Sequence, residues 1–134
     1  MGEAADLVRL AFKRVNEGDI DGLLELCSPR ITFQDVPEVP GSRLYEGRDG
    51  VREWVEGVRD VSESLQFTIS EIEERGDAVM TETSADMTGS RSGAEVGWRF
   101  WTVWRISEGM IAYHHGYSER EAALADLDGK PPAE

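Results

Sequence analysis

The sequence has few of the residues that cross-links, metal sites and phosphate sites require. One cysteine among 134 residues rules out an internal disulfide. The two histidines are adjacent, and there is no HxH or CxxC spacing, so we expect no metal ion. There is no glycine-rich phosphate loop either, and we expect no cofactor.

Basic residues are also scarce. Lys and Arg number 14 against 27 Asp and Glu, which gives a formal net charge of −13. A surface of this charge repels phosphate backbones and anionic lipids, so we expect no nucleic acid and no membrane as a partner. No apolar run approaches the roughly 18 residues that a membrane span needs. The opening MGEAADLVRL lacks the basic and apolar regions of a signal peptide, which predicts a cytoplasmic protein.

Two helices are predicted near the N-terminus. Apolar residues from Ala4 to Val15 recur at the i, i+3, i+4, i+7 spacing of one helix face, and the following NEGD breaks the helix. Asp19 is a suitable N-cap for a second, short helix that carries Cys27 on its apolar face and ends at Pro29. No basic group near Cys27 in the sequence favours a thiolate, so we expect a buried structural thiol.

The next segments alternate between strand, loop and helix. RITFQDV has the β-branched and aromatic residues of a strand, and PEVPGSR reads as a loop. A third helix is predicted from Asp49, which can cap it. A fourth begins at Ser118, because Ser118 and Glu121 have the spacing of a capping box. Residues 129–134 are expected to form a loose tail.

Four strand-like segments lie between the third and fourth helices. They read SLQFTISEIEE, AVMTETSADMT, EVGWRFWTVWRIS and MIAYHHGY, and short turns or the polar GSRSG loop join them. Consecutive strands of this kind predict an antiparallel meander. Because the helices are grouped before it, we predict an α+β fold in a single domain, residues 1–134, with helices on one face of a curved sheet.

Three stretches that span most of the chain resemble a known family. They are VNEGDIDGLLELCSPRITFQD, YEGRDGVREWVEGV and VWRISEGMIAYHHGYSEREAALADL. They resemble the SnoaL-like group of the nuclear transport factor 2-like superfamily, whose members include ketosteroid isomerases, scytalone dehydratase, epoxide hydrolases and polyketide cyclases. The resemblance implies a cone-shaped antiparallel sheet whose concave face, closed by helices, holds an apolar pocket for a small hydrophobic molecule.

The two histidines cannot share one site. Successive strand residues point to opposite faces, so His114 and His115 are separated by the sheet. The resemblance places His114 inside the cone and His115 on the outer face. A histidine with a pKa near 7 can act as acid or base. The alternative is a core histidine that is hydrogen-bonded to a neighbour.

Asp35 ends the first strand where, by the resemblance, ketosteroid isomerases keep their catalytic base. Buried among aromatic rings, its carboxyl would have a raised pKa; alternatively it turns the chain by bonding backbone amides. Asp35 and His114 are the predicted catalytic residues. The family's oxyanion donors would fall near Ala11 and Thr102, and the epoxide hydrolases' second acid at Gly116, so true isomerase and epoxide hydrolase activity are not expected.

Aromatic side chains could line the pocket. The predicted ligand-binding residues are Tyr45, Trp54, Trp98, Phe100, Thr102 and Trp104. As a set they suit a flat or cyclic ligand, whereas core packing is the alternative for each one alone. We therefore predict a protein that binds a small hydrophobic molecule. If it is an enzyme, Asp35 and His114 would transfer a proton in an isomerisation, dehydration or cyclisation. The alternative is a non-catalytic ligand-binding or dimerisation domain.

The strand-like segment Trp98–Ile106 is apolar at both even and odd positions. A sheet that is wetted on one face alternates apolar and polar residues, so both faces of this strand are expected to be covered. With the helices on one face, a partner subunit is the natural cover of the other. This predicts a homodimer through the outer-face residues Trp101, Val103, Tyr113 and His115.

Overall fold

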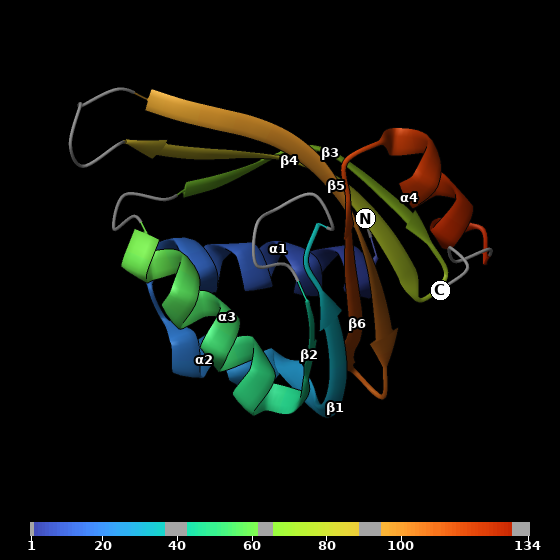
Figure 1. Ribbon diagram of the computed structural model, residues 1–134. Coiled ribbons are helices and arrows are strands. Elements are labelled where there is room, and N and C mark those ends of the chain that lie inside the picture. The colour runs from blue at the N-terminus through green and yellow to red at the C-terminus, as the bar shows by residue number, and fades with distance from the viewer. Residues whose placement is uncertain (1, 37–42, 62–65, 89–94, 130–134) are drawn as a thin grey trace.

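The computed structural model (Figure 1) describes residues 2–36, 43–61, 66–88 and 95–129, without the side chains of residues 58–61, 87–88 and 95–98. The elements are α1 (Glu3–Glu17), α2 (Ile20–Leu26), β1 (Cys27–Gln34), β2 (Leu44–Glu46), α3 (Gly47–Val61), β3 (Gln66–Arg75), β4 (Ala78–Thr88), β5 (Glu95–Ser107), β6 (Met110–Tyr117) and α4 (Arg120–Leu127). Most of the predicted loop 37–43, the predicted loop 89–93 and the predicted tail beyond Gly129 lie outside the described residues.

The described strands join one curved sheet in the order β2-β1-β6-β5-β4-β3. β3, β4, β5 and β6 pair antiparallel in sequence order, so the predicted meander is confirmed. β1 pairs with β6 in parallel, with Phe33 opposite His114, and antiparallel with β2. α1, α2 and α3 lie within the curve of the sheet (Figure 1). The predicted α+β class with a curved sheet is therefore confirmed.

The main core fills the space between these helices and the concave face. α1 is amphipathic, as predicted, and its buried face carries Val8, Ala11 and Phe12. α3 contributes Val51 and Val55. The strands contribute Ile31, Phe33, Phe67, Val79, Trp104 and Ile111. Removal of this apolar surface from water is the main force that holds the helices against the sheet.

α4 lies on the opposite, convex face (Figure 1), so the expectation that all helices share one face is wrong. Ala123 and Leu127 of α4 form a second apolar cluster with Ala78 and Met80 of β4 and Val103 of β5. Val103 is fully buried within the single chain. The expectation that a partner subunit covers Val103 is therefore wrong as well, because α4 already covers it.

Asp126 attaches α4 to the convex face through a buried hydrogen-bond network. Its side chain is fully buried, and Oδ2 accepts hydrogen bonds from the hydroxyls of Tyr113 at 2.6 Å and Tyr117 at 2.7 Å. Oδ1 accepts from Arg105 Nη2 at 2.8 Å. Burial and the adjacent carboxylate raise the pKa of both tyrosines, so both hydroxyls stay protonated as donors. The Tyr113 hydroxyl also lies 3.3 Å from His115 Nδ1.

The second helix begins as predicted and ends slightly earlier. Asp19 caps it, with Oδ1 accepting a hydrogen bond from the Gly22 amide at 2.9 Å. Cys27 is the C-cap of α2 and the first residue of β1, so its placement within the helix is wrong. The buried thiol is confirmed, because Cys27 is buried and burial raises its pKa to about 11.

Three other predicted boundaries are wrong. Pro29 lies inside β1, at a shift in the β1–β6 register where its missing amide is tolerated, instead of ending a helix. α3 begins at Gly47, ahead of the predicted cap Asp49. Ser118 does not form a capping box, because Glu119 is the N-cap of α4 and no side chain caps this helix.

We expect Asp126→Ala to lower the free energy of unfolding by about 3 kcal/mol, because it removes the acceptor shared by the buried Tyr117 and the half-buried Tyr113 and Arg105. Asp128→Ala is the matched control, since Asp128 lies at the end of the same helix in an exposed ion pair with Arg75. It should cost no more than about 1 kcal/mol. Urea unfolding at neutral pH measures both changes, and equal losses would contradict a buried attachment.

Candidate functional site

The strand register determines which side chains face the helices. Trp104 of β5 lies opposite His114 of β6, and His114 lies opposite Phe33 of β1. Trp104 and Phe33 belong to the concave core, and the His114 ring packs against both. His115 stacks instead on Tyr117 in the convex layer, with ring centroids 4.4 Å apart. The two histidines therefore lie on opposite faces of the sheet.

The imidazole of His114 is enclosed by aromatic rings. It stacks on Phe33 with ring centroids 3.7 Å apart and planes 5° from parallel. Trp104 meets it edge-on, with centroids 4.6 Å apart. Burial, with a smaller contribution from His115, lowers the pKa of His114 from 6.5 to about 3. The ring is uncharged at neutral pH, and the pKa near 7 expected of an acid–base histidine is not found.

Asp35 lies just past the end of β1 and is half-buried. Its Oδ2 accepts a hydrogen bond from Trp54 Nε1 at 2.9 Å, and its Oδ1 accepts from the Val36 amide at 2.8 Å. The bond to Val36 is of the backbone type considered as the alternative for Asp35. The bond to Trp54 was not predicted, and it fixes the orientation of both the carboxylate and the indole.

Trp54 connects Asp35 with the rings around His114. The centroid of its ring system lies 4.7 Å from that of Phe33 and 6.5 Å from that of His114. Asp35 and His114 thus border the same concave region from two sides of an indole. An indole is a hydrogen-bond donor only, so it does not pass a proton between them.

The residues predicted to bind a ligand are divided between the core and its margin. Trp104 belongs to the core, because it is 6% exposed and its Nε1 donates to Thr81 Oγ1 at 3.0 Å. Phe100 is half-buried, with its ring 6.1 Å from that of Phe67. Trp98 lies on β5, and its side chain is outside the described part of the chain.

Tyr45 lies on β2, a strand that was not predicted. It is opposite Phe33, and the two ring centroids are 6.3 Å apart. The guanidinium of Arg43 lies 4.2 Å from the Tyr45 ring centroid. α3 passes close by, because a Cβ on Gly50 would lie only 3.1 Å from Cβ of Tyr45. Tyr45 is therefore packed between the first strand and the third helix.

Three buried polar atoms on the concave side have no hydrogen-bond partner among the described residues: Thr83 Oγ1, Thr102 Oγ1 and His114 Nδ1. They come from the neighbouring strands β4, β5 and β6. Nearly all buried polar atoms in proteins are hydrogen-bonded, so these three require an explanation. Thr83 was not among the predicted site residues. It stands between the polar residues Glu82 and Ser84, and this alternation places its side chain on the opposite face of the strand from theirs.

Gly116 allows the end of β1 to close over β6. A Cβ at this position would lie 2.8 Å from Val36 Cγ2 and 3.0 Å from the Val36 nitrogen. Any larger residue would require the chain around Val36 to shift. The acid that the epoxide hydrolases place here therefore does not fit the present backbone.

The concave face thus combines the aromatic rings around His114 with buried polar atoms that have no partner among the described residues. Over the described ranges, no three His, Cys, Asp or Glu side chains are grouped in a way that could hold a metal ion. Over the same ranges, no helix is both long and apolar enough to cross a membrane.

Comparison with protein families gives a match to the SnoaL-like domain over residues 8–114. The matched range begins within α1 and ends at His114 on β6, so it includes Asp35, Trp54 and the unpartnered threonines. Among curated proteins, no sequence matches the chain.

Several solved structures are similar over nearly the whole chain. TerC, co-crystallised with polyporic acid, is 18% identical with a TM-score of 0.77, covering 94% of this chain and 98% of that one. A Mycobacterium tuberculosis protein in complex with estradiol-17beta-hemisuccinate is 16% identical with a TM-score of 0.75, covering 90% and 97%. SalBIII, an epoxide hydrolase/cyclase-like enzyme, is 21% identical with a TM-score of 0.73, covering 88% and 92%. At these identities the likeness shows the fold.

We expect His114 to make stability depend on pH. Its pKa in the folded chain, about 3, lies below the ordinary value of 6.5, so between these values the unfolded chain binds more protons. The stability that His114 contributes is fully present at pH values above its ordinary pKa of 6.5. It is lost as the pH falls toward its folded-state pKa of about 3. The loss amounts to about 2 kcal/mol between roughly pH 7 and 5.

The matched pair His114→Gln and His115→Gln isolates this effect. His114→Gln should lose the extra dependence of stability on pH, whereas His115→Gln should keep it. Urea unfolding of the three proteins at several pH values measures the slopes. If all three slopes agree, His114 is not buried as a neutral ring.

Proposed function

Because the chain belongs to the family of SnoaL-like domains, we propose that it binds a small, uncharged hydrophobic molecule on the concave face of its sheet. The ligand that suits this face is flat or cyclic and carries a hydroxyl or carbonyl group. Two relatives of the same fold support the cyclic body of this ligand, since one was crystallised with polyporic acid and another with estradiol-17beta-hemisuccinate.

The observation that carries the proposal is the group of unpartnered atoms on Thr83, Thr102 and His114. A buried polar atom without a partner costs about 1–3 kcal/mol. A ligand hydroxyl or carbonyl would remove part of this cost, because threonine hydroxyls and a neutral imidazole both donate and accept hydrogen bonds. The strand register sets them on a diagonal across β4, β5 and β6, with Thr102 between Thr83 and His114. A single ligand hydroxyl or carbonyl can therefore reach Thr102 and one of its two neighbours, and not all three atoms.

The same atoms favour an uncharged ligand. His114 is neutral, and the rings of Phe33 and Trp104 around it offer no counter-charge. Burial of an unpaired charge costs far more than burial of a neutral polar group. A charged ligand group would therefore have to stay outside this region.

Ligand entry requires side chains at the margin to move. Thr83 and Thr102 are fully closed to solvent, whereas Trp54 and Phe100 are half-buried beside the core. Movement of Trp54 would break its hydrogen bond to Asp35. Tryptophan fluorescence should therefore report binding.

We expect Thr102→Val to preserve or raise stability and to weaken ligand binding. Valine keeps the shape and removes a hydroxyl that has no partner, while the ligand loses one hydrogen bond, which weakens binding about tenfold. Thr81→Val is the matched control. Because Thr81 Oγ1 accepts the Trp104 indole proton, this variant should lose stability instead.

To find a ligand for this comparison, a library of cyclic ketones and phenols is screened against the protein. Binding is measured by the change in tryptophan fluorescence and by the rise in melting temperature. The proposal fails if no compound raises the melting temperature. It also fails if Thr102→Val is destabilised as much as Thr81→Val, since its hydroxyl would then already be satisfied.

Proton transfer on the bound ligand is a second candidate function, and Asp35 supports it. The bonds from Trp54 and Val36 hold its carboxylate in one orientation beside the concave face, as a general base requires. His114 would contribute as a neutral hydrogen-bonding group rather than as an acid. Isomerisation, dehydration and cyclisation are the reaction classes that such a base serves.

If Asp35 is a base, Asp35→Asn should slow proton exchange next to the carbonyl of a bound cyclic ketone by at least about a hundredfold. Affinity should change less than the exchange rate, because the single asparagine oxygen can keep the bond from Trp54 and only the bond from the Val36 amide is lost. Proton NMR in heavy water measures the exchange. Asp86→Asn, at an exposed acid of β4, is the control. If both variants exchange protons at the same rate, Asp35 is not a base and only the binding function remains.

The predicted homodimer stays a prediction, with a smaller surface available to it. α4 covers Val103, and Tyr113 is hydrogen-bonded to Asp126 within the chain. Trp101 and His115 are half-buried on the convex face and are the residues a partner would still cover. The mass of the protein in solution decides between one subunit and two. The cytoplasmic location also stays a prediction.

A further inference from the structure

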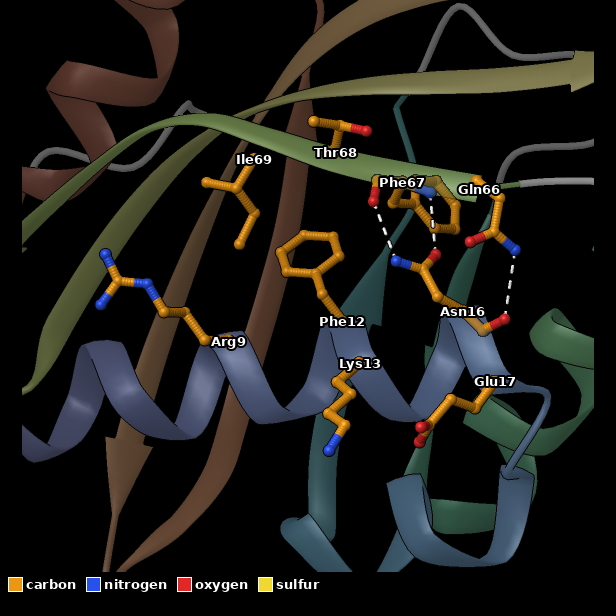
Figure 2. A pocket seen from close by; sticks show the side chains of 9 residues that line it. All are labelled: Arg9, Phe12, Lys13, Asn16, Glu17, Gln66, Phe67, Thr68 and Ile69. Atoms are coloured by element: carbon orange, nitrogen blue, oxygen red, sulfur yellow. Dashed lines mark hydrogen bonds between the residues drawn. The ribbon is translucent and has the colours of Figure 1, made fainter.

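An open groove lies between α1 and β3, beside the concave face rather than within it (Figure 2). Its volume is about 470 Å³, which is in the range of small-ligand sites. β3 is an edge strand of the sheet, so the groove runs along the free edge of that strand. Nothing in the function proposed above uses it.

Hydrogen bonds at two places hold α1 against β3. Near the C-terminal end of α1, the Asn16 side chain donates to the Phe67 carbonyl at 2.9 Å and accepts from the Phe67 amide at 2.8 Å. Near the other end, the Ala5 amide donates to Glu74 Oε1 at 2.7 Å. The groove lies between these two attachments, so its width is set before any ligand arrives. A preset site reduces the ordering cost of binding.

The floor of the groove is apolar and firmly supported. Phe12 of α1 and Ile69 of β3 approach each other between the two elements in Figure 2. The Phe12 ring also packs against Phe67, with centroids 6.0 Å apart, and against Trp104, with centroids 5.3 Å apart. The floor is therefore the outer surface of the main core. An apolar ligand body placed on it would lose contact with water.

Two cations border this floor. Arg9 and Lys13 lie one turn apart on α1. Figure 2 shows Arg9 directed toward β3 and the ammonium of Lys13 directed away from it, so Lys13 has to change rotamer to meet a ligand in the groove. Lys13 has no carboxylate at ion-pair distance among the described residues, and Arg9 approaches only Asp6, at 3.8 Å between two exposed side chains. Most other described arginines are committed to closer ion pairs. Exposed pairs such as Arg9–Asp6 contribute little, so both cations can turn to a ligand.

We propose that the groove binds an amphipathic carboxylate, a small organic anion with an aliphatic or aromatic body. The carboxylate would lie between Arg9, whose planar guanidinium can hold both oxygens, and Lys13. The body would lie over Phe12 and Ile69. Glu17 borders the groove one turn beyond Lys13 and would repel a second carboxylate, so monocarboxylates are preferred to dicarboxylates.

Octanoate below its micelle concentration is the probe, and octanol is the matched uncharged ligand. In two-dimensional amide NMR, octanoate should shift the backbone signals of residues around Arg9, Lys13 and Ile69. Octanol should bind this groove at least about fivefold more weakly than octanoate, because it lacks the charge. Suberate, the dicarboxylate of the same length, should also bind more weakly than octanoate.

Three variants test the role of the cations. Arg9→Gln and Lys13→Gln should each weaken octanoate binding about threefold to fivefold and leave octanol binding unchanged. Arg30→Gln, at an exposed cation of β1 outside the groove, is the matched control and should bind octanoate as the parent does. All three changes are at surface positions, and circular dichroism verifies that the fold is kept.

Three results would overturn the proposal. Octanoate could shift the amides around Thr102 and His114 and none beside the groove, which would place it on the concave face. Octanol could bind the groove as tightly as octanoate, which would make the cations irrelevant. Arg30→Gln could weaken octanoate binding as much as Lys13→Gln does, which would show that affinity depends on the net charge of the protein and not on cations at the groove.

Discussion

The stack of His114 on Phe33 fixes the arrangement of strands on which the concave site depends. β1 and β6 form a parallel pair, and parallel strands have no hairpin to set their register. The two stacked rings belong to residues that are directly opposite in that register, and a slip of one residue would turn a ring to the wrong face. Trp104 closes the same imidazole from β5. One buried ring thus connects three strands, and its burial also keeps it uncharged.

The two apolar faces of β5 are explained by two different covers. Its concave side meets α1, whereas α4 covers Val103 on the convex side. The apolar pattern correctly required a cover for both faces. It could not say whether the second cover is a helix of the same chain or a partner, because either supplies the same apolar surface. The cover is a helix of the same chain, and the buried Asp126 attaches it to the sheet. Because a carboxylate on a helix is rarely buried, the sequence pattern did not indicate this attachment.

Periodicity and parity predicted most of what is local. α1, the antiparallel meander and the separation of His114 from His115 follow from spacings of a few residues. The contact between Asp35 and Trp54 joins a strand end to a helix, and its existence depends on how α3 crosses β1. The lowered pKa of His114 likewise depends on rings from other strands. Sequence spacing carries no information about either, because both arise only when distant segments pack.

The two regions proposed for ligands differ in a way that follows from burial. The concave face is closed to solvent and holds a neutral imidazole, so it can accept a polar group but no unpaired charge. The groove beside α1 is open, and its two cations stay hydrated until a ligand arrives. The net charge of −13 does not cancel them, because exposed charges beyond a screening length of about 8 Å act weakly at physiological salt. A molecule with both an uncharged ring and a carboxylate would therefore be oriented by its charge, with the carboxylate kept on the outside.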